Sequence, residues 1–180
     1  TIPATTGAKE LKEKIRLTEG RCACNMMFHI GATNSNCHDL AYMARYGCPE
    51  EGISRDDIAG IKVFMGSSTG NMLVNDENTL EQIFRESPAL IATHCEQEDI
   101  IKANMAACTE QYGEEIPFEM HYKIRSRKAC IECTRKALDL AVRNNSRLHI
   151  LHISTEGRRE QHPLRHVPPG GHVPPVPSGK

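Results

Sequence analysis

GIKVFM, residues Gly60–Met65, is an almost continuous apolar run in a chain of 180 residues. A run this short, followed directly by glycine, predicts a strand that is buried on both faces, as strands of parallel sheets are. Three further runs have the same character, namely Asn25–Ile30, Ala89–Thr93 and Arg147–Ile153. Stretches with helical spacing separate all four runs, and this alternation predicts βαβ units around a parallel sheet.

The stretches between the strands have apolar residues on one helical face. Helices are expected at Lys9–Arg21, Asp39–Tyr46, Thr79–Glu86 and Ser126–Asn144, and a further helix is expected to end near Cys108. Thr93 and Glu96 have the spacing of a capping box, so that further helix is expected to open there. Four βα units make half of a (β/α)8 TIM barrel. On pattern alone, an open flavodoxin-like sheet is the alternative.

Composition excludes several classes of protein. The formal net charge is −1, with 25% charged and 39% apolar residues, which argues against a nucleic-acid-binding or anionic-membrane surface. Apolar runs stay well below the ~20 residues that a membrane helix needs. The opening Thr1-Ile2-Pro3 lacks the basic and apolar regions of a signal peptide, so a cytoplasmic location is expected. The first residue is not Met, and the natural start is expected elsewhere.

Eight cysteines raise the alternatives of disulfides and of a zinc site. Cys22 and Cys24 are too close for a usual zinc pair, and Cys130-x-x-Cys133 has no second pair at zinc-ribbon spacing. A redox CxxC motif would need a preceding strand, which is not predicted here. The cysteines are therefore interpreted as small buried residues of a reducing compartment.

The last part of the chain differs from the rest. Gly157–Lys180 holds six of the ten prolines and three of the nine histidines. Such a composition cannot form a core element and is typical of disorder. We divide the chain into a partial barrel domain, residues 1–156, and a Pro/His/Gly-rich tail, residues 157–180, which is interpreted as unrelated to the fold.

Lys62 is out of place in its apolar strand, because burial of a charged ammonium is unfavourable. One explanation is that Lys62 lies at a strand edge and extends its ammonium to water. The functional explanation is a lysine that burial keeps neutral, for use as a nucleophile or a modified base. Both explanations remain open on the residues alone.

Two histidines follow apolar strands closely. His94 ends the run Ala89–Thr93, and His152 lies near the end of Arg147–Ile153. Active sites of barrels are built at the carboxyl ends of the strands, and neutral imidazole is a common zinc ligand. His149 lies three residues before His152, so strand alternation predicts that the two point to opposite faces. We choose His152 as the candidate because it is nearer the strand end.

Four motifs carry a resemblance to a known family. They are GIKVFMGSSTGNMLV (Gly60–Val74), IATHCE (Ile91–Glu96), HYKIRSRKAC (His121–Cys130) and RLHILHIST (Arg147–Thr155). In this order and spacing they resemble dihydroorotases of the long bacterial type, within the amidohydrolase superfamily. The resemblance extends from Thr1 to about residue 156.

This resemblance implies a (β/α)8 barrel with a binuclear metal centre, usually of zinc. Lys62 matches the lysine that reacts with CO2 to give a carbamate bridging the two metals, and His94 and His152 match ligands of one of them. The implied reaction is the interconversion of N-carbamoyl-L-aspartate and dihydroorotate in pyrimidine biosynthesis. The binding partner that this resemblance implies is the small-molecule substrate. A homo-oligomer is a possible assembly of the protein.

Other family features find no match here. The family has a His-x-His pair before the lysine and a catalytic Asp near its eighth strand. The chain is therefore expected to be an internal fragment that is inactive by itself. A hydantoinase or allantoinase is the alternative within the superfamily. A non-catalytic assembly partner is a further alternative, against which the retained Lys62, His94 and His152 argue, and an inert truncated product is the third.

Overall fold

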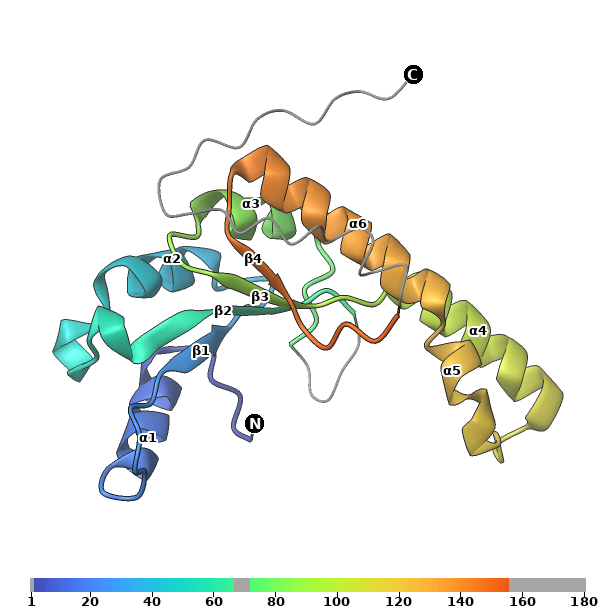
Figure 1. Ribbon diagram of the computed structural model, residues 1–180, viewed down its shortest axis with the longest axis horizontal. Helices are drawn as coiled ribbons and strands as arrows, with labels where there is room; N and C mark the ends of the chain where they lie inside the picture. Colours follow the sequence, from blue (N-terminus) through green and yellow to red (C-terminus); the bar gives the residue numbers. More distant parts are fainter. Residues whose placement is uncertain (1, 67–71, 156–180) are drawn as a thin grey trace.

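The computed structural model, shown in Figure 1, describes residues 2–66 and 72–155. Its centre is a sheet of four parallel strands in the order β1-β2-β3-β4. The strands are β1 (Phe28–Gly31), β2 (Ile58–Phe64), β3 (Ile91–His94) and β4 (Leu148–Ile150). Each strand pairs with the next one along the chain, as in half of a (β/α)8 barrel. The flavodoxin-like alternative is wrong, because its strand order reverses after the first strand.

Helices precede and connect the strands, and some of them cover one face of the sheet. They are α1 (Ala8–Thr18), α2 (Cys37–Tyr46), α3 (Glu77–Glu86), α4 (Glu98–Tyr112), α5 (His121–Ile124) and α6 (Arg127–Asn144). Three short 3-10 turns are η1 (Pro49–Glu51), η2 (Arg55–Asp57) and η3 (Phe118–Met120). Figure 1 shows α2, α3 and α6 side by side over the sheet, while α4 and α5 extend beyond the strand ends. None of the helices in the described parts is long and apolar enough to cross a membrane.

Local chemistry explains where two of these helices begin. The side chain of Asp76 accepts a hydrogen bond from the backbone N–H of Thr79 at 2.7 Å and caps α3. Ser126 caps α6 through the backbone N–H of Ala129 at 3.4 Å, at the position where the sequence predicts this helix to begin. The predicted capping box at Thr93 is wrong, because Thr93 is a fully buried residue of β3 and α4 begins only at Glu98.

The face of the sheet under the helices is apolar and fully covered. We call it the outer face, and in β2 it carries Ile61 and Val63, which are 1% and 0% exposed. Leu40 of α2 and Phe84 of α3 are part of the same buried cluster. Burial of this cluster supplies the main hydrophobic stabilisation of the fold.

The opposite face, which we call the inner face, carries titratable side chains. Cross-strand partners point to the same side of a sheet. The register pairs Lys62 with Ala92 and Ala92 with His149, and it also pairs His29 with Gly60, two residues before Lys62. His29, Lys62 and His149 therefore share this face, on which both histidines are exposed and Lys62 is half-buried.

The structure tests the interpretation of the cysteines. All eight are free thiols, six of them buried, and Cys130 and Cys133 lie on the buried side of α6. The prediction of burial is wrong for Cys22 and Cys24, which lie in the exposed connection between α1 and β1. The predicted tail, 157–180, lies outside the described residues, so its disorder and the domain division stay predictions.

Candidate metal centre

His94 and His152 are in direct contact at the carboxyl edge of the sheet. Nδ1 of His94 lies 2.8 Å from Nε2 of His152, and the ring centroids are 4.8 Å apart. His94 is the last residue of β3, and its side chain is buried. His152 lies two residues beyond β4 with a φ of 39°, a left-handed conformation that is uncommon for a residue other than glycine. With the backbone of His152 in this conformation, its ring lies against the ring of His94.

The structure corrects the reasoning that separated His152 from His149. The sequence predicts a strand through Ile153, with the two histidines on opposite faces. The strand in fact ends at Ile150, so alternation does not extend to His152. His149 shares the inner face with Lys62, while His152 reaches His94 from the irregular segment that follows the strand. The prediction that the two histidines point to opposite faces of one strand is therefore wrong.

Lys62 lies on the inner face, two residues before the end of β2. Its Nζ is 3.7 Å from the centroid of the Phe64 ring and donates a long hydrogen bond of 3.4 Å to the carbonyl of Val63. Burial lowers the pKa of Lys62 to about 8, against a smaller opposing effect of Cys95. A substantial fraction of this amine is therefore neutral at mildly alkaline pH.

The three predicted site residues thus share one region without all being in contact. Phe64 and His94 are register partners with ring centroids 6.0 Å apart, and Phe64 also lies under the Lys62 ammonium. Lys62 lies two residues before Phe64 in β2, so it is farther from the carboxyl edge of the sheet than the two histidines. Within residues 2–66 and 72–155, no three His, Cys, Asp or Glu side chains form a ready-made metal cluster.

Two charged residues that the sequence analysis did not assign to the site lie behind His94. Glu96 is 7% exposed, and its Oε2 lies 2.9 Å from Nε2 of His94. The guanidinium of Arg125 donates from Nη1 to the same oxygen. Burial alone would raise the pKa of Glu96, but the His94 contact and the positive charge of Arg125 outweigh it, and the pKa is lowered. Glu96 is therefore a carboxylate at neutral pH.

A sequence signal for these two residues was present. Glu96 closely follows the run Ala89–Thr93, which predicts a buried strand, and a lone carboxylate needs a partner if it is buried. Arg125 lies in the HYKIRSRKAC motif, which the resemblance already singled out. The capping-box interpretation assigned Glu96 to a helix that in fact begins two residues later.

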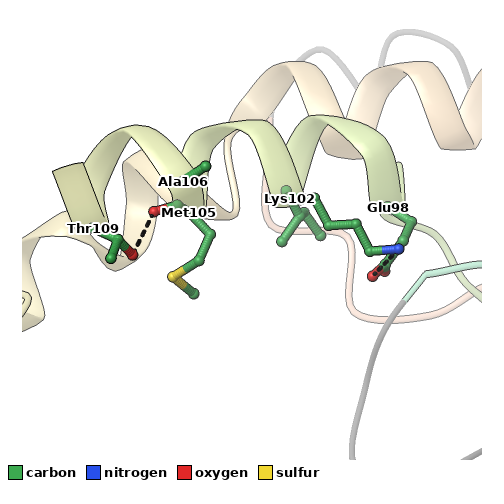
Figure 2. A pocket seen from close by; sticks show the side chains of 6 residues that line it. Glu98, Lys102, Met105, Ala106 and Thr109 are labelled. Atoms are coloured by element: carbon green, nitrogen blue, oxygen red, sulfur yellow. Dashed lines mark hydrogen bonds and ion pairs between the residues drawn. The ribbon is translucent and has the colours of Figure 1, made fainter. Parts of the chain in front are cut away.

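A separate hollow of about 580 Å³ lies on the exposed side of α4. Figure 2 shows its lining, in which Lys102 pairs with Glu98 and the Thr109 hydroxyl donates to the carbonyl of Met105. The lining includes none of Lys62, His94 and His152. The hollow is therefore not part of the candidate site.

Comparison with known proteins gives one sequence relative. No family model matches the chain. A curated protein named dihydroorotase, from Methanosarcina acetivorans, is 27% identical over 158 residues. The match covers 86% of this chain and 31% of the relative, so the chain spans about a third of the relative's length.

Solved structures give the fold. The L-hydantoinase (dihydropyrimidinase) of Arthrobacter aurescens superposes with a TM-score of 0.75 at 23% identity, over 89% of this chain and 34% of that protein. The dihydropyrimidinase of Brevibacillus agri superposes with a TM-score of 0.67 at 22% identity, over 89% of this chain and 35% of that protein. The chain thus resembles that dihydroorotase in sequence, and its fold is that of part of a (β/α)8 barrel, shared with these solved structures.

Proposed function

We propose that this chain is the ligand-bearing part of a metal-dependent hydrolase of cyclic amides. The observation that carries the proposal is the approach of two imidazole nitrogens, Nδ1 of His94 and Nε2 of His152, to 2.8 Å at the carboxyl edge of the sheet. Ring nitrogens that converge at this edge of a parallel sheet are suited to hold one divalent metal. Zinc is the metal that the resemblance to dihydroorotases favours.

The donor set fits a zinc ion with a small adjustment. Two nitrogens bound to tetrahedral zinc at ~2.1 Å lie roughly 3.4 Å from each other. The His94 and His152 nitrogens are 2.8 Å apart, so the rings need to separate by about half an ångström. His152 is exposed and lies outside the strand, which allows that movement.

Lys62 is proposed to supply a further ligand, as a carbamate. The neutral amine attacks the carbon of CO2, an N–C bond forms, and one amine proton passes to solvent, which leaves an anionic carboxylate group on Nζ. This step needs the unprotonated amine, and the lowered pKa of Lys62 favours that form. A bound metal pair would supply Lewis-acid activation of the amide carbonyl and of water.

The substrate is proposed to be a small cyclic amide, with dihydroorotate as the first candidate. The sequence relative named dihydroorotase supports this choice. Hydantoin-type rings are the second candidate, because the similar structures are named hydantoinase and dihydropyrimidinase. The eight free thiols support a reducing, cytoplasmic location as part of the same proposal.

The carbamate gives a direct test. The chain is equilibrated with zinc and 13C-labelled bicarbonate, and a carbamate is sought by 13C NMR. We expect a carbamate signal that is lost in Lys62→Arg and weakened in His94→Ala, because the metal stabilises the modified lysine. Lack of a signal in the unsubstituted chain, or an equal signal in Lys62→Arg, would contradict the assignment of Lys62.

The substrate class is tested by ligand binding. Dihydroorotate and hydantoin are titrated separately into the zinc-loaded chain, and binding is followed by saturation-transfer NMR. Tighter binding of dihydroorotate is expected. A clear preference for hydantoin would assign the chain to the hydantoinase alternative, and binding of neither would contradict a cyclic amide site.

A further inference from the structure

Glu96 is a buried carboxylate for which the proposed ligand set has no use. Its side chain is 9% exposed, although removal of a carboxylate from water is unfavourable unless it is paired. Its partners are the ring of His94 and the guanidinium of Arg125, which meet at the same oxygen. The carboxylate therefore links a proposed metal ligand to a cation from the distant connection between α5 and α6.

The two ring nitrogens of His94 face different groups. Nδ1 faces His152, and Nε2 faces Glu96 at 2.9 Å. A neutral imidazole carries one proton, and a metal takes the nitrogen without it. A carboxylate beside Nε2 favours the proton on that nitrogen and leaves Nδ1 free to bind a metal.

The Nε2 contact is short but lies off the direction of a hydrogen bond, so Nε2 has no hydrogen-bond partner within the described parts of the chain. Torsions between sp3 and sp2 atoms have broad minima, and a small rotation of the ring aligns Nε2 with Glu96. The same rotation can accompany the separation of His94 from His152 that a metal requires.

Glu96 itself is not suited to be the metal ligand. The oxygen nearest His94 already accepts from the Arg125 guanidinium, and the other oxygen lies 3.8 Å from the Cys130 thiol. A divalent cation at Glu96 would be repelled by the guanidinium. The metal position therefore lies on the Nδ1 side of the ring.

The backbone on both sides of Glu96 is fixed. The carbonyl of His94 accepts from Met65 N at 3.0 Å, and Gln97 N donates to the Ala129 carbonyl at 3.0 Å. Before Arg125, the side chain of Asn104 donates to the Ile124 carbonyl at 3.0 Å. The carboxylate and the guanidinium are thus presented from segments that are held in place before any metal binds.

We propose that Glu96, held by Arg125, is a positioning residue that orients the His94 ring with Nδ1 toward the metal. This inference rests on the proposed function. Carboxylates commonly play this part behind metal-bound histidines, where they fix the proton on the far nitrogen and the angle of the ring. Arg125 acts one step further away and holds the Glu96 carboxylate in place.

The test uses the 180-residue chain with three substitutions. Glu96→Gln removes the charge and keeps the size. Glu98→Gln is the matched control, since its carboxylate pairs with the Lys102 ammonium at 3.7 Å. Glu96→Gln combined with Arg125→Met removes both charges, so that no unpaired guanidinium remains to destabilise the fold.

Two measurements are made on each variant. Cobalt(II) affinity is obtained by competition with a chromophoric chelator, and the tautomer of His94 in the metal-free chain is read from long-range 1H–15N NMR. We expect about 10- to 100-fold weaker cobalt binding in Glu96→Gln, and no rescue in the double variant. We expect the Nε2–H tautomer in the unsubstituted chain and in Glu98→Gln, and a mixture of tautomers when Glu96 is replaced.

The outcomes distinguish a positioning role of Glu96 from an effect on folding, and they test the positioning role separately from the proposed metal centre. Affinity that returns to the unsubstituted value in the double variant would show that Glu96 acts only through stability, and would overturn the inference. An unchanged tautomer in Glu96→Gln would overturn it as well. If Glu96 sets the tautomer but the unsubstituted chain binds no cobalt, the positioning role stands and the proposed metal centre fails.

Discussion

The two faces of the sheet come from the same strands but have opposite characters. On the outer face, Ile61 and Val63 are fully buried under α2, α3 and α6. On the inner face, Lys62 is half-buried, and His29 and His149 are exposed. Successive side chains of a strand point to opposite faces, so Lys62 lies on the inner face although its sequence neighbours Ile61 and Val63 lie on the outer face.

The difference teaches where stability and chemistry reside in this fold. Apolar side chains of the outer face gain free energy by leaving water, and substitutions there act on folding. The inner face carries groups that titrate or bind, and it contributes less to folding. Substitutions on the two faces should therefore separate cleanly, and the predictions below run from the largest expected effect to the smallest.

The largest loss is expected from Ile61→Ala. The side chain is 1% exposed in the main core cluster, and its truncation leaves a cavity. We expect the free energy of unfolding to fall by about 2–5 kcal/mol in urea denaturation. Val142→Ala on α6, where the side chain is 71% exposed, is the control and should change it by less than ~0.5 kcal/mol. Equal effects of the two would contradict the burial of Ile61 on the outer face.

Gly66→Ala is expected to have the next largest effect. A Cβ at this position would lie 2.0 Å from the Glu96 carbonyl oxygen, which is backbone and cannot move alone. We expect a loss of roughly 1–3 kcal/mol, with weaker cobalt binding because the segment after β3 is displaced. At Gly7 an added Cβ would meet only the movable end of the Glu10 side chain, at 3.0 Å. Gly7→Ala is the control, and an equal loss there would remove the steric explanation.

Lys62→Met should stabilise the fold at neutral pH. The folded-state pKa of Lys62 is about 8 and its ordinary value is 10.5, so the unfolded chain binds the proton more tightly. The gain should be on the order of 1 kcal/mol after allowance for the partial exposure of the ammonium. It should be largest below pH 8 and shrink as pH rises toward 10.5, as followed by urea denaturation across this range. A gain that does not depend on pH would show that charge burial is not its cause.

The smallest effect is expected from His149→Ala. The ring is exposed on the inner face, and its removal should change the free energy of unfolding by less than ~0.5 kcal/mol. The substitution should also leave the midpoint of thermal unfolding unchanged, both at low and at high protein concentration. A loss that appears only at high concentration would show that this face is covered by another copy in solution.

Much of the fold could be predicted because apolar runs and helical spacing report burial directly. The runs around Ile61 and Ile91 form adjacent parallel strands, and the longest helix lies where it was expected, at Arg127–Asn144. The exposure of Cys22 and Cys24 could not be read from composition, since the other six cysteines of the chain are buried.

Less of the candidate site could be predicted, because its geometry depends on where strands end. The resemblance implied that His94 and His152 serve one metal, but the contact between their rings involves the left-handed conformation of His152 beyond β4, which no pattern in the sequence specifies. Glu96 was given a capping role because its spacing from Thr93 is right for one. Its actual partner, Arg125, comes from a segment 29 residues away, and only the folded structure brings them together.

The strand order has a consequence for how the chain is made. Because β1, β2, β3 and β4 pair strictly in the order of synthesis, each new strand finds its partner already present as it leaves the ribosome. In the described part of the chain, β2, β3 and β4 each pair with a strand that is made earlier, and each loop to be closed is one βα unit long. The sheet can therefore grow during translation by the addition of each new strand to the same edge.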